Sequence, residues 1–384
     1  MNLSNENSAE KLHIQTIAVH TGYNSNSLDG DIMQPIHLAT TFKRKVDGTM
    51  NDYSYTRSNN PNREAVEKKI AAIEGGSEAF AFSSGMAAIN ALFENILEPG
   101  AHIIIPDDCY HGTRNLLDKF FIRWKVDFSE VDMTDTKNVA DAIKSTTRLI
   151  WMETPSNPQL KIVDIEAMTS IARQNKITIA CDNTFATPLL QHPLLMGVDF
   201  VMHSSTKFFS GHSDVLGGVI IVKENTAISE RLREYQQIAG AVPSPFDCWL
   251  LNRSLATFPI RIPLQCNNAM ALAKHFISHP KIEKVFYPGL PGHINHKIAV
   301  KQMQGGFGSI LSILVKGGKQ EAINFAGKLR IFKHATSLGG VESLVEHRRS
   351  AEGAHPLSPD NLLRISVGIE YIDDLVNDIN QALE

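Results

Sequence analysis

Short apolar runs alternate with amphipathic segments through the middle of the chain. An apolar run of four to eight residues is typical of a buried strand, whereas apolar positions that recur every three or four residues indicate a helix. The pattern predicts strands at 102–105, 149–152, 177–181, 200–203 and 217–222, and helices at 63–74, 84–97 and 165–175. Because strands that alternate with helices form parallel sheets, we predict an α/β fold with a mostly parallel, doubly wound sheet.

The two ends of the chain differ from this middle part. Residues 1–54 are polar and rich in turn-forming residues, which is typical of an arm. After a break at 241–245 comes a long helical segment, followed by strands at 308–315 and 362–367 and helices that begin at 319 and end at 382. At 384 residues the chain exceeds one ordinary core. We expect an arm at 1–54, a large domain at 55–245 and a smaller C-terminal α+β domain at 246–384.

Composition and charge narrow the range of partners. The net charge is −4 and the basic residues are dispersed, so we expect a small-molecule substrate and no nucleic acid. We expect a cytoplasmic protein without a membrane partner, since no apolar run could span a bilayer and the N-terminus lacks signal-peptide features. Four cysteines without metal or disulfide spacing favour buried, reduced thiols: Cys109, Cys181, Cys248 and Cys266. No metal site is predicted, because His111, His203 and His212 share no fixed face for ligands.

Lys207 is the most informative single residue. It follows the apolar strand at 200–203 and is flanked by Phe208 and Phe209. An exposed lysine has a pKa of about 10.4 and is mostly an unreactive ammonium, whereas a desolvated lysine can be a nucleophilic amine. Ser204 and Thr206 can donate hydrogen bonds to a phosphate oxygen. These surroundings favour a reactive lysine over the alternative, a solvated lysine after a strand.

Asp182 stands at the end of another predicted strand and precedes Lys207 by 25 residues. In an open parallel sheet, ligands bind outside the carboxyl ends of the strands, so Asp182 and Lys207 can face one pocket. A buried carboxylate needs a cationic partner, and a pyridinium nitrogen would supply one. Pyridoxal 5'-phosphate (PLP) uses this combination of a lysine at its aldehyde and an acid at its ring nitrogen. The alternative is an aspartate in a turn or helix cap.

A candidate phosphate site lies at 82–93, where small residues open an amphipathic helix. The backbone amides of Gly85 and Met86 would point at an anion at the helix start, and glycine permits close approach. Many helices begin in this way, so the segment indicates a phosphate site only in combination with Lys207 and Asp182.

Across nearly its whole length, the chain resembles the cystathionine gamma-synthase and gamma-lyase family, the trans-sulfuration PLP enzymes of cysteine and methionine metabolism. The segments that carry the resemblance are 55–63, 83–86, 153–158, 182–188, 203–218, 337–344 and 363–368. The resemblance implies PLP fold type I, with the arm contacting a neighbouring subunit. It also implies a homo-oligomer with shared active sites, as a dimer of dimers.

The resemblance further implies a role for each matching residue. Lys207 would be the Schiff-base lysine and catalytic acid/base, Asp182 the partner of the ring nitrogen, and Tyr110 the catalytic residue stacked on the ring. Asn157 would contact both cofactor and substrate. The phosphate would be held by Gly85, Met86, Ser204 and Thr206, joined by Tyr55 and Arg57 of a neighbouring subunit. The substrate carboxylates would be held by Arg364 with the backbone around Ser337, by Asn157, and by Arg114 at the distal end.

The residue types support these roles unequally. Arg364 offers a planar fork that matches a carboxylate. Its alternative, a structural salt bridge, is disfavoured because few acids lie nearby in the sequence and Gly368 permits close approach. Tyr110 could equally be a packed core ring. For Tyr55 and Arg57, the alternative is a solvated turn.

Three departures from the family pattern concern the substrate. Family members that act on cystathionine commonly carry acids at the positions of Ser54 and Thr336, so these neutral residues weaken recognition of a distal ammonium. The segment at 345–355 is shorter than usual and lacks a Met-Thr-His stretch. In the family, this segment lies near the substrate entrance.

The sequence therefore predicts a PLP-dependent carbon-sulfur lyase or gamma-replacement transferase. It would catalyse gamma or beta elimination or replacement on cystathionine or a related homoserine-derived sulfur amino acid, with cystathionine gamma-lyase or gamma-synthase favoured. The alternatives are methionine gamma-lyase or O-acyl-homoserine sulfhydrylase and, more remotely, a PLP aminotransferase or a non-catalytic PLP-binding regulatory protein. A non-catalytic protein would be expected to have lost Lys207, Asp182, Tyr110 or Arg364, and all four are present.

Overall fold

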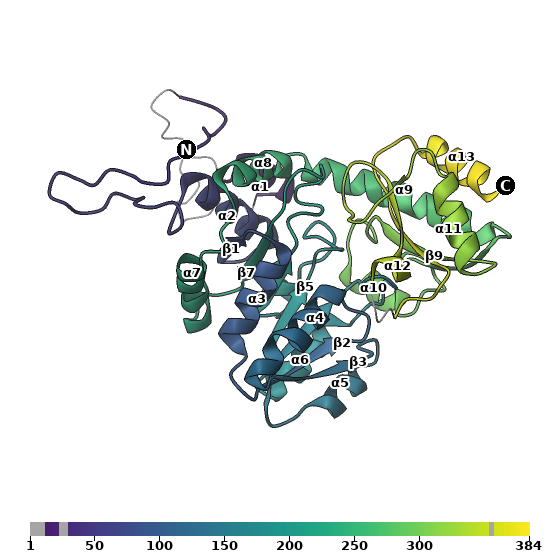
Figure 1. Ribbon diagram of the computed structural model, residues 1–384, viewed down its shortest axis with the longest axis horizontal. Helices are drawn as coiled ribbons and strands as arrows, with labels where there is room; N and C mark the ends of the chain where they lie inside the picture. Colours follow the sequence, from purple (N-terminus) through teal and green to yellow (C-terminus); the bar gives the residue numbers. More distant parts are fainter. Residues whose placement is uncertain (1–11, 23–29, 353–356) are drawn as a thin grey trace.

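The computed structural model describes residues 12–22, 30–352 and 357–384. It contains two β-sheets, each covered by helices, in successive parts of the chain (Figure 1). The long helix α9 (Phe258–Ser278), drawn in green, runs from the larger part toward the smaller one. The short helix α1 (Ile14–His20) precedes both sheets.

The larger sheet has seven strands in the order β1-β7-β6-β5-β4-β2-β3. All neighbouring strands are parallel except β7, which is antiparallel to both β1 and β6. This arrangement confirms the predicted mostly parallel sheet. The strands are β1 (Glu78–Phe82), β2 (His102–Pro106), β3 (Asp127–Val131), β4 (Thr147–Glu153), β5 (Thr178–Asp182), β6 (Phe200–His203) and β7 (Gly218–Val222).

Both faces of this sheet are buried, because alternate residues of its strands pack into two different apolar cores. In β4, Ile150 and Met152 belong to one core, whereas Leu149 and Trp151 belong to the other. This is the burial pattern of a sheet with helices on both faces. The helices of this part are α2 (Pro61–Glu74), α3 (Gly85–Ile96), α4 (His111–Lys119), α5 (Thr136–Ala142), α6 (Ile165–Gln174) and α7 (Ala227–Ala239), with 3₁₀ turns η1 (Phe121–Trp124) and η2 (Pro193–Met196).

The smaller sheet has five strands in the order β10-β11-β12-β9-β8 and its own apolar core, as expected for an α+β domain. Its strands are β8 (Ile282–Phe286), β9 (Ile310–Val315), β10 (Lys333–His334), β11 (Leu344–His347) and β12 (Leu362–Ser366). The accompanying helices are α10 (His296–Gln302), α11 (Lys319–Lys328), α12 (Arg348–Ala351) and α13 (Ile372–Leu383). The domain limits at 54 and 245 stay predictions. Helix α8 (Pro245–Leu255), just after the second limit, contributes Cys248, Leu251 and Leu255 to the core of the larger sheet.

The described part of the arm projects from the body around the bridge between Thr41 and Tyr55 (Figure 1). It carries exposed apolar side chains, among them Ile32, Leu38 and Val46. Its contact with a neighbouring subunit stays a prediction. Residues 1–11 and most of the turn-rich run, 23–29, lie outside the described residues.

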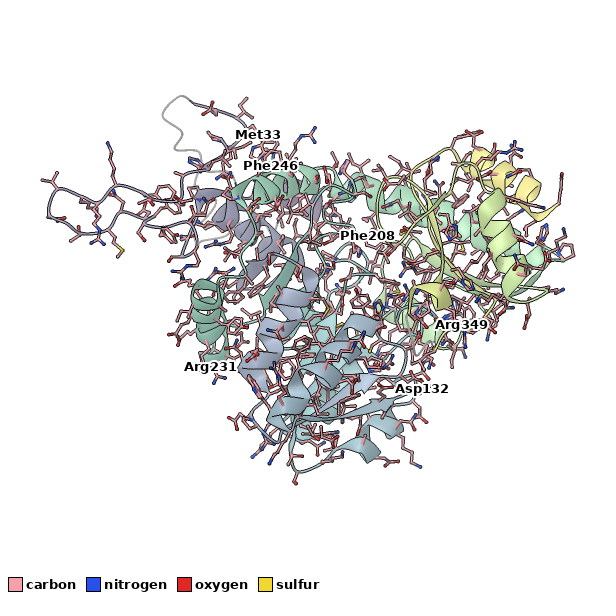
Figure 2. All side chains as sticks on the ribbon, viewed as in Figure 1. Met33, Asp132, Phe208, Arg231, Phe246 and Arg349 are labelled. Carbon is pink, nitrogen blue, oxygen red and sulfur yellow. The ribbon has the colours of Figure 1, made fainter. Side chains whose placement is uncertain are left out.

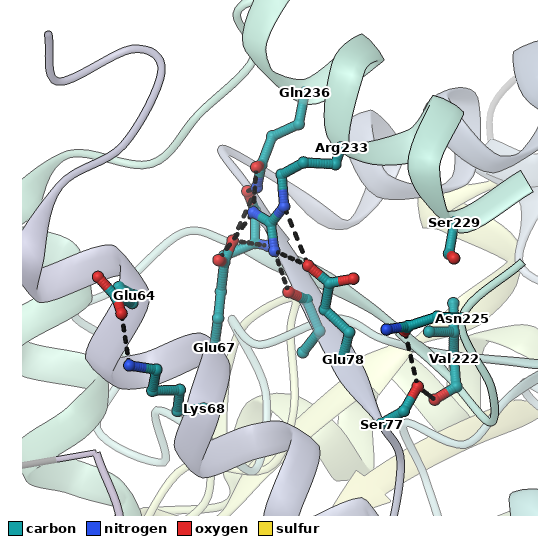
Figure 3. Close-up of polar contacts among 12 residues, drawn as sticks. Glu64, Glu67, Lys68, Ser77, Glu78, Val222, Asn225, Ser229, Arg233 and Gln236 are labelled. Atoms are coloured by element: carbon teal, nitrogen blue, oxygen red, sulfur yellow. Dashed lines mark hydrogen bonds and ion pairs between the residues drawn. The ribbon is translucent and has the colours of Figure 1, made fainter. Parts of the chain in front are cut away.

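Side chains from α2 and α7 cover the outer side of the edge strand β1 (Figure 3). Arg233 Nη2 donates to the carbonyl of Ala79 at 3.1 Å. Glu67 accepts a hydrogen bond from the amide of Ala81 at 2.8 Å, and Gln236 donates to the carbonyl of Ala81 at 2.7 Å. Arg233 and Glu67 also form an ion pair at 2.9 Å. The outward backbone groups of this part of β1 are therefore satisfied by side chains.

The described residues include neither a membrane-spanning helix nor a metal cluster. Within the described ranges, no helix combines the length and apolar character that a bilayer crossing requires. No group of three or more histidine, cysteine or acidic side chains gathers there as a metal site would require. His203 instead lies 2.7 Å from Glu74, with both side chains buried, which confirms its expected hydrogen-bonding role.

Candidate active site

A cavity of about 470 Å³ lies where the carboxyl ends of β5 and β6 face the smaller domain. Its walls come from both sheets, from the start of α3 and from the loop before β11. It brings together most of the residues singled out in the sequence: Gly85, Met86, Tyr110, Asn157, Asp182, Ser204, Thr206, Lys207, Ser337 and Arg364. Tyr55, Arg57 and Arg114 are not among its lining residues.

Lys207 enters the cavity from the loop that follows β6. Its Nζ donates a hydrogen bond to Ser337 Oγ at 2.9 Å, which links the two domains. Burial, and next the positive charge of Arg364, lowers the pKa of Lys207 to about 8. Phe208 and Phe209 are each 2% exposed, and Phe208 is labelled in Figure 2 between the domains. The lysine is thus desolvated, as its aromatic neighbours predicted.

The lowered pKa predicts the chemical reactivity of Lys207 in the cofactor-free protein. We expect its labelling by a small amine-specific reagent to rise with a midpoint near pH 8, because only the neutral amine reacts. Exposed lysines should still gain reactivity toward their ordinary pKa of about 10.4. Peptide mass spectrometry over a pH series would measure both midpoints. A midpoint for Lys207 equal to that of the exposed lysines would contradict the desolvated site.

Asp182 ends β5, next to the strand that leads to Lys207. It is 9% exposed, and its Oδ1 accepts a hydrogen bond from the amide of Thr184 at 2.9 Å. Burial raises the pKa of Asp182 above its ordinary value, while the Thr184 hydrogen bonds oppose this effect. A cation beside Asp182 would stabilise its charged form.

Glu153 is a second buried carboxylate that the sequence reasoning missed. It ends β4 and lies directly opposite Asp182 in the parallel pairing of β4 and β5. Burial, and next the charge of Asp182, raises the pKa of Glu153 well above its ordinary value. Its Oε2 accepts a hydrogen bond from the amide of Tyr110 at 2.9 Å. Its place at a strand end, in the segment 153–158, was the signal that could have revealed it.

Tyr110 precedes helix α4 and borders the cavity. A Cβ atom at Gly112 would lie 2.4 Å from Cε1 of the Tyr110 ring and 2.9 Å from the sulfur of Met86. Glycine at 112 therefore lets the ring lie over the first turn of α4, beside Met86. Burial raises the pKa of Tyr110, so the phenol stays protonated at neutral pH.

The start of α3 is the candidate phosphate cradle predicted at 82–93. Ser84 caps this helix by accepting a hydrogen bond from the amide of Ala87 at 3.0 Å, and the first amides of a helix have no partner within it. A Cβ atom at Gly218 would lie 2.4 Å from the carbonyl oxygen of Ser84, so glycine lets β7 pass close to the cradle. Ser204 and Thr206 also line the cavity, and the Thr206 hydroxyl is held by the amide of Gly217 at 2.9 Å.

Arg364 extends from β12 and is almost fully buried. Its Nη1 donates to Asn157 Oδ1 at 3.0 Å, and its Nη2 donates to the carbonyl of Ser337 at 3.1 Å. Its Nη2 also lies 2.6 Å from Glu346 Oε2. The sequence-based argument that few acids lie near Arg364 was therefore wrong. Glu346 is 18 residues away along the chain, but the antiparallel pairing of β11 and β12 places it opposite Arg364.

Glu346 carries the negative charge that offsets the positive charges of Arg364 and Arg348. Burial alone would raise its pKa, but Arg364 and next Arg348 lower it below the ordinary value. Glu346 is therefore ionised at neutral pH and holds the Arg364 guanidinium in place. The other edge of that guanidinium, with Asn157 and the Ser337 carbonyl beside it, faces the same cavity as Lys207.

The remaining predicted residues lie elsewhere. Arg57 donates a hydrogen bond to the carbonyl of Gln237, and Tyr55 is an exposed residue just after the arm. Arg114 Nε donates to Glu130 Oε1 at 2.5 Å, and its Nη2 donates to the carbonyl of Asp107 at 3.0 Å. The functional roles assigned to these three residues stay predictions.

Comparisons with known proteins agree with this geometry. The family model described as "Cys/Met metabolism PLP-dependent enzyme" matches residues 15–384. A cystathionine gamma-synthase of Mycobacterium tuberculosis is 44% identical over 374 residues, which cover 96% of each chain. A cystathionine beta-lyase of Coxiella burnetii is 42% identical over 388 residues, covering 98% of this chain and 99% of the relative. The crystal structure of metB from Corynebacterium glutamicum superimposes with a TM-score of 0.94, at 42% identity, covering 97% of this chain and 98% of that one.

Proposed function

Because the chain belongs to the PLP-dependent enzymes of cysteine and methionine metabolism, we propose that it catalyses elimination or replacement on cystathionine or a related homoserine derivative. The main support for this proposal is that Lys207, Asp182 and Arg364 line one cavity. The fold is that of PLP fold type I enzymes, with a large mostly parallel sheet and a smaller second sheet. Cystathionine gamma-lyase or gamma-synthase chemistry remains the favoured assignment.

The residues around the cavity fit PLP as the cofactor. The cradle at the start of α3 suits its phosphate, the buried carboxylate of Asp182 suits its ring nitrogen, and the amine of Lys207 suits its aldehyde. The two buried carboxylates at 153 and 182 lie side by side, and a cation in the cavity would offset their mutual repulsion. When bound, PLP supplies an electron sink for a carbanion.

Each side chain then has a definite task. Arg364 and Asn157 bind the α-carboxylate of the substrate and so orient its α carbon toward Lys207. Lys207 Nζ removes the α proton and returns protons to other carbons, because its lowered pKa makes the neutral amine accessible near neutral pH. The protonated Tyr110 phenol would pack against the cofactor and could donate a hydrogen bond to a departing group.

We also propose that the active enzyme is a homo-oligomer, a dimer of dimers in which Tyr55 and Arg57 of a neighbouring subunit complete the phosphate site. Neither Tyr55 nor Arg57 lines the cavity of its own chain, which supports this assignment. The exposed apolar side chains of the arm would be buried by such a contact.

The four cysteines are free and buried, which supports a cytoplasmic location.

Product analysis would test the proposed reaction. One preparation should be offered L-cystathionine, L-methionine, O-succinyl-L-homoserine with cysteine, and O-acetyl-L-homoserine with sulfide. We expect kcat/KM for cystathionine or the succinyl ester to exceed that for methionine by about tenfold or more, because the distal end of methionine has no charged group to bind. Cysteine with 2-oxobutyrate would show γ elimination, homocysteine with pyruvate would show β elimination, and cystathionine made from the ester would show replacement.

Two outcomes would change the assignment. Higher turnover of methionine, or of the acetyl ester with sulfide, would favour methionine gamma-lyase or O-acyl-homoserine sulfhydrylase activity. Exchange of amino groups with 2-oxoglutarate, without release of a thiol or 2-oxobutyrate, would favour an aminotransferase instead.

A further inference from the structure

Arg348 is a second buried guanidinium in the cavity, and none of the predicted roles involves it. It is the first residue of α12 and directly follows β11. It lines the cavity and is only 4% exposed. Its Nη1 donates to Glu346 Oε2 at 2.8 Å, the same oxygen that Arg364 contacts. The two guanidinium groups therefore flank one carboxylate oxygen on one wall of the site.

The hydrogen-bonding capacity of Arg348 is incompletely used. A guanidinium has five N–H donors. The buried Nε of Arg348 has no hydrogen-bond partner, and its Nη2 lies 3.9 Å from Glu352, beyond hydrogen-bond distance. The Glu352 carboxylate instead accepts hydrogen bonds from the amides of Leu357 and Ser358. Because an unpaired buried donor destabilises the protein, an anion that enters the cavity beside Arg348 would be bound favourably.

Apart from the shared Glu346 oxygen, Arg348 and Arg364 have different neighbours. The charge of Arg348 lowers the pKa of His111, which lines the cavity and on which burial acts in the same direction. At Tyr110, which also lines the cavity, the charges of Arg348 and Arg364 both oppose the raising effect of burial on the pKa. Arg364, in contrast, is directed to Asn157 and the Ser337 carbonyl. A substrate bound at Arg364 therefore has Arg348 in the wall of the same cavity, which Tyr110 and His111 also line.

Arg114, the residue expected to receive a distal carboxylate, lies outside this cavity and is paired with Glu130. Thr336 lines the cavity and carries no charge that could hold a distal ammonium. The cationic group available for the far end of a substrate is therefore the guanidinium of Arg348. It lies in the segment 345–355, which departs from the family pattern.

We propose that Arg348 forms the binding subsite for an anionic group at the distal end of the substrate. This inference rests on the proposed function and makes it more specific. The preferred substrates are homoserine derivatives or sulfur amino acids that end in a carboxylate, and those with a neutral distal end are disfavoured. Arg348 is in this sense a specificity-determining residue, whereas Arg364 serves every amino-acid substrate.

Two amino acids without a leaving group isolate this effect. L-2-Aminosuberate has the chain length of cystathionine and ends in a carboxylate, whereas L-2-aminooctanoate has the same length and ends in a methyl group. Calorimetry on the cofactor-loaded protein would give Kd for each. We expect the wild-type protein to bind aminosuberate about 10- to 100-fold more tightly, the range for hydrogen bonds to a buried charged group. Arg348→Met should reduce this preference to a few-fold at most.

Arg349→Met is the matched control. Arg349 follows Arg348 directly and carries the same charge, but it pairs with Asp360, donates to the carbonyl of Ser358 and does not line the cavity. This variant should keep the wild-type preference for aminosuberate. Arg114→Met tests the competing assignment in the same assay, and it should retain the preference if Arg348 is the receptor.

Three results would overturn the proposal. The first is a wild-type Kd ratio near one. The second is an equal loss of affinity for both ligands in Arg348→Met. That result would mean that Arg348 only positions Glu346 and, through it, Arg364. The third is loss of the preference in Arg114→Met but not in Arg348→Met. If Arg348→Met does not fold, Arg348→Lys must still lower the ratio, because it loses the forked donor geometry. Absence of turnover on all four substrates would count against the proposed function only, since the Kd ratio does not depend on turnover.

Discussion

Replacement of Lys207 by alanine is expected to reduce kcat/KM about 10³-fold or more on the best substrate. A positioned acid or base contributes about 10²- to 10⁴-fold to a rate, and the change also removes the amine that suits the cofactor aldehyde. Steady-state assays with saturating PLP would measure the loss. The side chain is hydrogen-bonded to Ser337 but belongs to none of the three apolar cores, so the variant should fold with a Tm close to that of the wild-type protein.

Two controls make the result specific to the amine. A small added amine such as methylamine should partly restore turnover in Lys207→Ala, because the vacated space can admit it. Lys207→Arg should stay inactive without rescue, since a guanidinium keeps its proton.

Borohydride treatment of the wild-type holoprotein should fix the cofactor to the peptide that contains Lys207. Label on another lysine, or a Lys207→Ala variant as active as wild type, would refute the proposed site.

The second large effect is expected for Asp182→Asn, which should lower kcat about 10²-fold with the cofactor still bound. The change preserves shape but removes the negative charge, and one buried charge pair of this kind contributes about 3 kcal/mol or more. Thr184 would still donate to the side-chain oxygen, so the local backbone should be retained. The measurement is kcat at saturating PLP, together with the affinity for PLP.

Glu153→Gln is the matched control for this prediction. Glu153 is equally buried and lies opposite Asp182, but burial and the charge of Asp182 raise its pKa well above the ordinary value, which disfavours its charged form. Its glutamine replacement can still accept the hydrogen bond from the Tyr110 amide. We expect kcat of Glu153→Gln to decrease only a few-fold. If Glu153→Gln were the more damaging change, Glu153 rather than Asp182 would be the partner of the cofactor ring.

Much of the fold could be predicted because its signals are local. The helix at 84–97 matches α3, whose cap residues are Ser84 and Leu97, and the strand at 200–203 matches β6 in both bounds. The edge strand β3 was missed because its sequence, Asp-Phe-Ser-Glu-Val, is partly charged and only half buried. Strand β8 is similarly mixed in polarity, with an exposed Glu-Lys pair. Such strands are held by their neighbours rather than by an apolar run of their own.

The candidate site shows the same division between local and distant information. Lys207 and Asp182 could be paired from the sequence because both follow buried strands of one parallel sheet. Glu346 could not be paired with Arg364, since that contact depends on the antiparallel register of β11 and β12. Arg348 was noticed only as part of an unusual segment. Its direction into the cavity depends on how α12 follows β11, which no local pattern encodes.

The covered edge at β1 has a consequence for how copies of this chain can associate. An open edge strand can add a strand from another molecule, which leads to continuous sheets and aggregation. Here the outward groups of Ala79 and Ala81 are already hydrogen-bonded to Arg233, Glu67 and Gln236. An incoming strand would first have to displace an ion pair and several hydrogen bonds. A strand from another copy therefore cannot continue the sheet along this part of β1 without the loss of these contacts.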